Sequence, residues 1–170
     1  MEPQREERGI SAMRPKSLTF LCYLTIFASL YMILSSFEGI FNTDQLVKRT
    51  EELISEYDAI ITANSRDSKG IEEFQKALKE ISLANNSSNI HDYSVFTLIF
   101  NSLTLIGAFL MLRLKKNGFR LYALGNLIAV VSSILVFGGN NWLGIAYAGY
   151  HGLTGIIFTT LYALKMKYMD

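Results

Sequence analysis

The chain has 170 residues, of which half are hydrophobic and 18% are charged, with a net charge of +1 at neutral pH. This composition is too apolar and too poor in charge for an ordinary soluble domain. A single cysteine, Cys22, excludes an internal disulfide, and the lack of a basic patch with interleaved aromatics excludes a nucleic-acid partner.

The first long apolar run predicts a membrane span at residues 17–37, after a cytoplasmic tail at 1–16. No charged residue lies between Leu18 and Phe37, and about 20 helical residues cross the hydrocarbon core of a bilayer. The run is longer than the roughly 7–15 apolar residues of a secretory signal peptide, and no A-x-A-like cleavage site follows it. We therefore interpret it as an uncleaved anchor, with Cys22 as a packing residue inside it.

Residues 38–92 predict an extramembrane helical hairpin. Apolar residues recur there at three- and four-residue spacing, in two stretches separated by the polar TANSRDSKG segment. Either the two apolar stripes face each other and form a small local core, which we expect, or a second copy or a partner completes them. A two-helix core is marginal on its own, so the same stripes form the candidate partner surface: Leu46, Leu53, Tyr57, Ile61, Phe74 and Leu78.

The rest of the chain predicts three more spans. No charged residue lies between Tyr93 and Leu112, and none between Leu121 and Leu164, where His151 alone is potentially cationic. The run from Leu121 to Leu164 is long enough for two spans, and the GGNNW segment provides a turn between them. The expected order is a span at 93–113, a cytoplasmic loop at 114–118, a span at 119–137, an outer turn at 138–142, a span at 143–164 and a cytoplasmic tail at 165–170.

The distribution of basic residues predicts the orientation. With four spans, both tails and the 114–118 loop share one side, where ten of the 16 Lys and Arg residues gather: Arg5, Arg8, Arg14, Lys16, Arg113, Lys115, Lys116, Arg120, Lys165 and Lys167. Residues 38–92 hold six basic and eleven acidic residues. The positive-inside rule then places both termini in the cytoplasm and the hairpin outside. Insertion alone explains this bias, although the RLKK cluster is also a candidate for binding anionic lipid headgroups.

Polar and small residues form a stripe on each predicted span, which indicates an all-α, antiparallel four-helix bundle inside the membrane. Glycines at small-xxx-small spacing predict that its closest contacts run through the last span. A polar cluster is expected at His151, Asn101, Ser29, Ser133 and Tyr147, since three of its members lie about 11 Å below the outer face by helical rise. The cluster serves either as a proton or ligand site or as a neutral hydrogen-bonded contact between helices. We expect the second, because no intramembrane carboxylate is present to stabilise a charged imidazole.

No motif of a known catalytic or metal site occurs in the chain. Glu38, His91 and Asp92 are expected near one another at the outer surface, but their spacing matches no metal motif, and interfacial polarity explains them better. The sequence therefore predicts no enzyme activity, no cofactor and no metal.

Two stretches carry a resemblance to a known group of proteins: LRLKKNGFRLYALGN, residues 112–126, and IIFTTLYALKMKYM, residues 156–169. They resemble small four-pass membrane proteins of Bacteroidota, in which the inner loop reads like LKKxGFxLY and the last span ends in a basic tail. The resemblance covers about the last 70 residues. It implies a bacterial inner membrane location and supplies no site residues.

These observations predict a non-enzymatic multi-pass protein that acts as an accessory, assembly or oligomeric subunit. Its expected partners are the lipid bilayer and either another membrane protein or a second copy of the chain. The alternative is a small transporter or channel protomer that uses His151 and Asn101, and an integral-membrane enzyme is a third hypothesis.

Overall fold

The computed structural model describes residues 15–64 and 68–169. Most of the predicted N-terminal tail, the tip of the hairpin and Asp170 lie outside these ranges. The described residues form six α-helices, one short 3₁₀-helix and no strand: α1 (Lys16–Phe41), α2 (Thr43–Asn64), α3 (Ser68–Ala84), α4 (Ser87–Leu112), α5 (Lys116–Phe137), α6 (Trp142–Ala163) and η1 (Met166–Tyr168). The predicted all-α class is confirmed.

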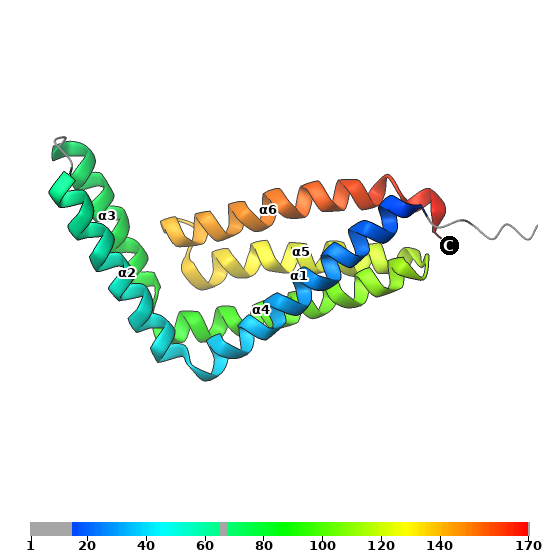
Figure 1. The fold of residues 1–170 in the computed structure, drawn as a ribbon, viewed down its shortest axis with the longest axis horizontal. Helices are drawn as coiled ribbons and strands as arrows, with labels where there is room; N and C mark the ends of the chain where they lie inside the picture. Colours follow the sequence, from blue (N-terminus) through cyan, green and yellow to red (C-terminus); the bar gives the residue numbers. More distant parts are fainter. Residues whose placement is uncertain (1–14, 65–67, 170) are drawn as a thin grey trace, which may run out of the picture.

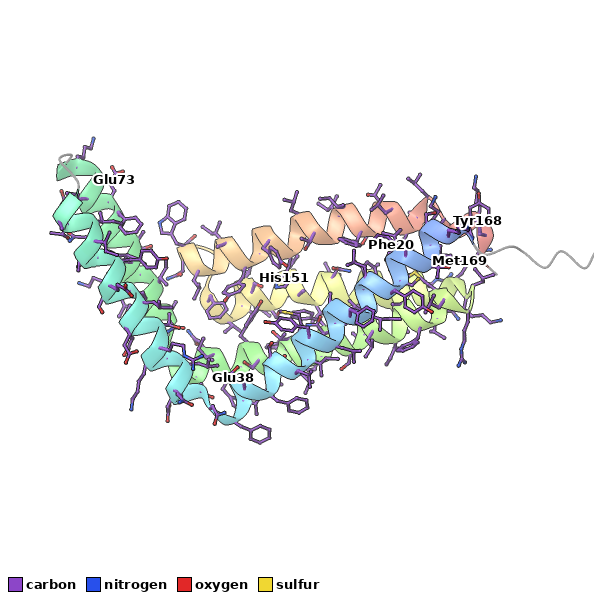
Figure 2. The ribbon with its side chains drawn as sticks, viewed as in Figure 1. Phe20, Glu38, Glu73, His151, Tyr168 and Met169 are labelled. Atoms are coloured by element: carbon purple, nitrogen blue, oxygen red, sulfur yellow. The ribbon has the colours of Figure 1, made fainter. Side chains whose placement is uncertain are left out.

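Four of the helices, α1, α4, α5 and α6, run alongside one another and form an elongated body (Figure 1). Helix α4 packs against both α1 and α5, and α6 packs against α5. The remaining helices, α2 and α3, lie side by side and project at an angle from one end of the body. Tyr168 and Met169 lie at the opposite end of the molecule from Glu73 on α3 (Figure 2).

Three helices are long and apolar enough to cross a membrane: α1, α4 and α5. The structure therefore supports three of the four predicted spans. Helix α6 has the same 22-residue length as α5 but is not among these three helices, because tyrosine, glycine and histidine lower the mean hydropathy of a helix. That α6 also crosses the membrane stays a prediction.

The interior of the body contains polar as well as apolar side chains, and its outer surface is rich in large apolar ones, unlike the surface of a soluble protein. Its buried side chains include Ser29, Ser132 and Ser133, each at most 3% exposed. Large apolar side chains point outward on all four helices, including Phe27 on α1 and Ile156 on α6, at 70% and 68% exposure. This arrangement suits a hydrocarbon surround, in which polar groups find partners only inside the protein.

A close backbone contact that was not expected from sequence joins α4 to α5. A Cβ atom added at Gly118 would lie 2.5 Å from the carbonyl oxygen of Gly107. Only glycine permits backbones to approach this closely. On α6, Gly144 lies against the backbone of Gly138 and Gly155 against Asn126, whereas an added Cβ at Gly152 would meet only Val130 at 3.9 Å and one at Gly149 no atom within 4 Å.

Side-chain hydrogen bonds connect the projecting helices to each other and to the body. Between α2 and α3, Gln75 Nε2 donates to Asp58 Oδ1 at 3.0 Å. At the base, Ser87 Oγ donates to Asp44 Oδ1 at 2.6 Å. Asn141 Nδ2, in the turn between α5 and α6, donates to the Glu80 carbonyl of α3 at 2.9 Å. The angle between α2–α3 and the body is thus held from two sides.

Candidate functional site

His151 lies buried in the body, at 8% exposure, on the face of α6 that points inward (Figure 2). Its Nε2 atom shares a hydrogen bond of 2.8 Å with the hydroxyl of Tyr93, at the start of the apolar part of α4. The rings of Phe100 and Tyr150 each lie 5.2 Å from the imidazole, edge to face. Within the described part of the chain, the imidazole therefore has a hydrogen-bonding partner and two aromatic neighbours, and it forms no ion pair with a carboxylate.

Tyr93 is the partner of His151 that sequence reasoning missed. Two of the predicted cluster residues lie beside Tyr93 and make no hydrogen bond to His151. The ring of Tyr147 is 4.9 Å from the ring of Tyr93, and Phe137 completes this group of three aromatic rings. Ser133 donates to the Ala129 carbonyl at 2.8 Å, and its side chain also interacts with Tyr93.

The other two predicted cluster residues, Asn101 and Ser29, make hydrogen bonds away from His151. Asn101 Nδ2 donates to the Thr97 carbonyl of its own helix at 2.9 Å. The hydroxyl of Ser29 shares a 2.9 Å hydrogen bond with that of Thr104, which joins α1 to α4. The expected hydrogen bonds of His151 to Asn101 and Ser29 are therefore not formed.

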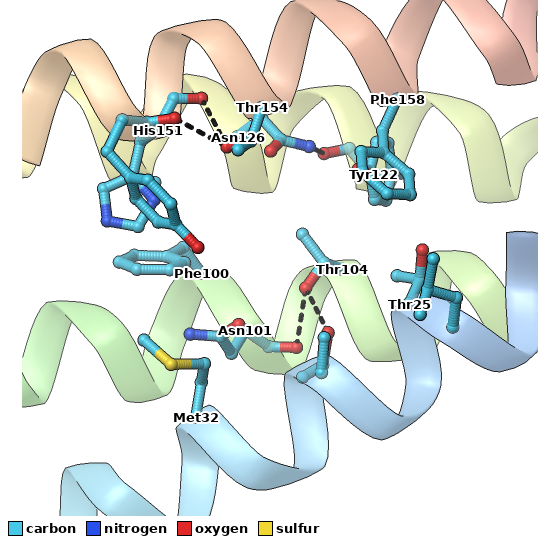
Figure 3. A pocket seen from close by; sticks show the side chains of 15 residues that line it. Thr25, Met32, Phe100, Asn101, Thr104, Tyr122, Asn126, His151, Thr154 and Phe158 are labelled. Carbon is cyan, nitrogen blue, oxygen red and sulfur yellow. Dashed lines mark hydrogen bonds between the residues drawn. The ribbon is translucent and has the colours of Figure 1, made fainter.

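A cavity nevertheless brings His151, Asn101 and Ser29 together (Figure 3). Its volume is about 310 Å³, and all four helices of the body contribute to its walls. No Asp, Glu, Lys or Arg lines it, and its polar lining includes Thr25, Ser29, Asn101, Thr104, Asn126 and His151. The sequence indicated only that Thr25, Thr104 and Asn126 lie on the inward polar stripes of their helices. Nothing else in it predicted that they line a cavity.

The cavity ends in a tightly packed cluster towards the termini. There the Tyr162 hydroxyl shares a 2.8 Å hydrogen bond with the Thr25 hydroxyl, joining α6 to α1. Leu18, Cys22 and Met111 in this cluster are fully buried. Side chains therefore fill the space between the cavity and this end of the body.

Of the polar residues expected together at the other end of the body, His91 and Asp92 contact each other, whereas Glu38 pairs elsewhere. Glu38 forms an exposed ion pair with Arg49 at 3.9 Å. His91 Nδ1 lies 3.5 Å from the carboxylate of its neighbour Asp92. Within residues 15–64 and 68–169, no three such side chains are grouped so as to hold a metal ion.

The six residues of the candidate partner surface divide into two groups. Leu46, Ile61 and Leu78 are half-buried. Leu53, Tyr57 and Phe74 are exposed, at 49%, 57% and 37%. The two stripes thus bury only part of their apolar area within the hairpin.

Comparison with known proteins gave no match, whether to a family model, to a curated protein or to a solved structure. The resemblance to four-pass proteins of Bacteroidota stays a prediction from the sequence.

Proposed function

We propose that this protein is a four-span protein of a bacterial inner membrane that acts by binding another protein and not by catalysis. In this proposal α1, α4, α5 and α6 form an antiparallel four-helix bundle across the bilayer, both termini are cytoplasmic, and α2 and α3 form an extracytoplasmic hairpin. The partner is a membrane protein or a second copy of the chain. The exposed apolar face of the hairpin carries the proposal.

The membrane placement of α6 is supported by its surface. Ile145, Leu153 and Ile156 are 49%, 64% and 68% exposed on α6, and the helix carries no Asp, Glu, Lys or Arg. In water this surface would be a large apolar patch, whereas in a bilayer it faces lipid. The start of α1, the α4–α5 connection and the chain's C-terminal end also lie together, at the end of the body away from α2 and α3 (Figure 1). The clustered basic residues of the connection and C-terminal segment support a cytoplasmic location for that end.

The binding surface is supported by the spacing and exposure of apolar side chains on α2. Leu53, Tyr57 and Ile60 lie four and three residues apart, so they share one helix face, and each is 48–57% exposed. The hairpin stands away from the body, in a region where lipid does not cover this face under the proposed topology. Exposed apolar surface rimmed by charged residues is typical of a protein interface.

Photocrosslinking in living cells tests the proposal. A photoreactive phenylalanine analogue placed at Tyr57 should give a discrete adduct, which mass spectrometry identifies as a second copy or a different membrane protein. The same analogue at Glu56, an exposed neighbour that points about 100° away around the helix, is the matched control and should give little adduct. If positions 53, 57 and 74 all fail to give an adduct, the hairpin is not a binding surface.

Transport through the body is the second candidate function, and the polar-lined cavity is the observation that favours it. A transport path would have to open the packed cluster around Tyr162 and Thr25, which fills the space between the cavity and the end of the body carrying the termini. The discriminating variant is His151→Ala, which should abolish transport while insertion and folding persist.

A further inference from the structure

The cavity beside His151 opens sideways between α1 and α6. Leu24 and Ala28 on α1 and Tyr150 on α6 line the cavity and are also exposed on the surface of the body. Leu24 is 45% exposed and Tyr150 is 62% exposed. Helices α1 and α6 approach each other where Thr25 and Tyr162 share a hydrogen bond and diverge from there towards the hairpin end (Figure 1). These residues therefore form a mouth on the side of the body.

The mouth faces lipid if the body spans the bilayer as proposed above. Leu24 and Tyr150 each lie on the order of 12 Å along their helices, at about 1.5 Å rise per residue. Because α1 and α6 begin at opposite ends of the body, both positions fall within the hydrocarbon core, which is about 30 Å thick. A molecule that enters this mouth therefore comes from the membrane and not from water.

The polar wall is suited to an uncharged headgroup. No Asp, Glu, Lys or Arg lines the cavity, and a charged headgroup without a partner is costly at this depth. The Nδ2 of Asn101 is used by the Thr97 carbonyl, and its Oδ1 accepts no hydrogen bond from the described part of the chain. Among the same residues only one nitrogen of His151, Nε2, is engaged, with Tyr93.

A hydroxyl group satisfies this site in either tautomer of His151. If Tyr93 donates to Nε2, the second ring nitrogen carries a proton and donates to a ligand. If Tyr93 accepts from Nε2, the second nitrogen accepts instead. In both cases a ligand hydroxyl has a partner on the imidazole, and the acceptor oxygen of Asn101 on α4 offers a second contact in the cavity.

We propose that the cavity binds a neutral, hydroxyl-bearing lipid of the diacylglycerol type. The headgroup lies among Asn101, Asn126 and His151, and the acyl chains leave through the mouth between Leu24 and Tyr150. A volume of about 310 Å³ is at the lower end of small-molecule sites, which span roughly 300–1,000 Å³. The cavity therefore holds the headgroup and the first part of the chains, and the remainder stays in the bilayer. This inference rests on the proposed membrane placement but not on the proposed protein partner.

The test is photolabelling of the purified full-length protein in phosphatidylcholine nanodiscs. The probe is a dioctanoylglycerol analogue with a diazirine in one acyl chain and an alkyne tag. Labelled peptides should come from α1 and α6 on the two sides of the mouth. Unlabelled dioctanoylglycerol should compete, whereas dioctanoyl phosphatidic acid, with the same chains and a charged phosphate in place of the hydroxyl, should not.

Two tryptophan variants test the location. Ala28→Trp fills the mouth from an exposed position and should reduce labelling about tenfold or more, which corresponds to about 1.4 kcal/mol or more of binding free energy. Ala146→Trp, on an exposed part of α6 outside the cavity, should leave labelling unchanged. Thermal melting of both variants checks that they are folded. Asn101→Leu should also weaken labelling, because it removes the acceptor oxygen.

Other outcomes overturn the inference. Equal labelling of Ala28→Trp and the wild type, or equal competition by phosphatidic acid, would show that the lipid is held elsewhere or without regard to its hydroxyl. A chain that enters nanodiscs but is not labelled contradicts the lipid site alone. A chain that does not enter them contradicts the membrane placement as well.

Discussion

At the scale of single residues, the hydrogen bond between Tyr93 and His151 is the contact with the clearest consequence. Tyr93→Phe removes the hydroxyl, leaves the packing of the ring intact and deprives Nε2 of its partner at 2.8 Å. We expect this variant to lose about 1 kcal/mol of unfolding free energy, typical of a buried hydrogen bond and near the upper values found inside membranes. The measurement is equilibrium unfolding in mixed detergent micelles with increasing SDS.

Tyr31→Phe is the matched control for Tyr93→Phe. Tyr31 is 68% exposed on α1, so its hydroxyl contributes nothing to the interior, and the change should stay within about 0.5 kcal/mol. If both variants lose the same stability, the Tyr93 hydroxyl has no special role in holding His151.

The sequence identified His151 as a buried polar residue but did not identify its partner. Depth along the helices ranked Asn101 and Ser29 as the nearest groups, because that estimate treats each residue as a point on a straight, parallel rod. Tyrosine has a long side chain, and the helices of the body are inclined to one another. Tyr93 therefore contacts His151 although the depth estimate did not place the two residues side by side. Asn101 instead bonds to its own helix at Thr97, an option open to any helical residue with a short polar side chain.

At the scale of helices, the contact between α4 and α5 depends on Gly107 and Gly118. In Gly118→Ala the added methyl group would lie 2.5 Å from the Gly107 carbonyl oxygen and 2.7 Å from the Met111 nitrogen. Both are backbone atoms, so the two helices must separate. We expect a loss of about 1–3 kcal/mol of unfolding free energy, as for other overpacked sites, measured by the same SDS titration.

Gly149→Ala is the control for this glycine contact, and it should change stability in the opposite direction. An added Cβ at Gly149 meets nothing within 4 Å, and alanine favours a helix over glycine by up to about 1 kcal/mol. Equal losses for the two variants would show that the close approach at Gly118 does not hold α4 and α5 together.

The helices themselves were largely predictable from uncharged runs and apolar periodicity, although α1 continues past Glu38 to Phe41 and α4 begins at Ser87, ahead of its uncharged run. The contacts between helices were not. Small-xxx-small spacing on α6 predicted close contacts at Gly144, Gly152 and Gly155, and the structure places Gly144 against Gly138 and Gly155 against Asn126 but leaves Gly152 near a single distant methyl group. Gly107 and Gly118 lie on different helices, so their pairing leaves no short motif in the sequence.

At the scale of the whole molecule, burial gives information that hydropathy does not. Helix α6 is not among the three helices that mean hydropathy identifies as candidate spans, because it carries tyrosines, glycines and His151, and His151, Gly144 and Gly155 among them are buried. Its exposed residues are nevertheless mostly large and apolar. A membrane span that packs through polar residues can have a low mean hydropathy although its outer face is strongly apolar. Mean hydropathy alone therefore does not show whether α6 crosses the membrane.

Finding the side of the membrane on which the C-terminal segment lies therefore tests whether α6 crosses the bilayer. In a Cys22→Ser background, which removes the single native cysteine, we consider single cysteines at Ser55, Asn117 and Tyr168. All three residues are exposed and none is charged, so the basic residues that direct insertion are unchanged. A membrane-impermeant maleimide should label Ser55→Cys in intact spheroplasts, but Asn117→Cys and Tyr168→Cys only after permeabilisation.

Each position reports on a different part of the proposed topology. Labelling at Ser55 places the α2–α3 hairpin outside, and protection at Asn117 places the α4–α5 connection in the cytoplasm. Tyr168 separates four spans from three, because a chain whose α6 stayed outside would carry this residue on the hairpin side and label at once. Rapid labelling of Tyr168→Cys in intact spheroplasts, with Asn117→Cys still protected, would leave α6 outside the bilayer. The cavity beside His151 would then open to water, and its proposed lipid ligand would be ruled out with the fourth span.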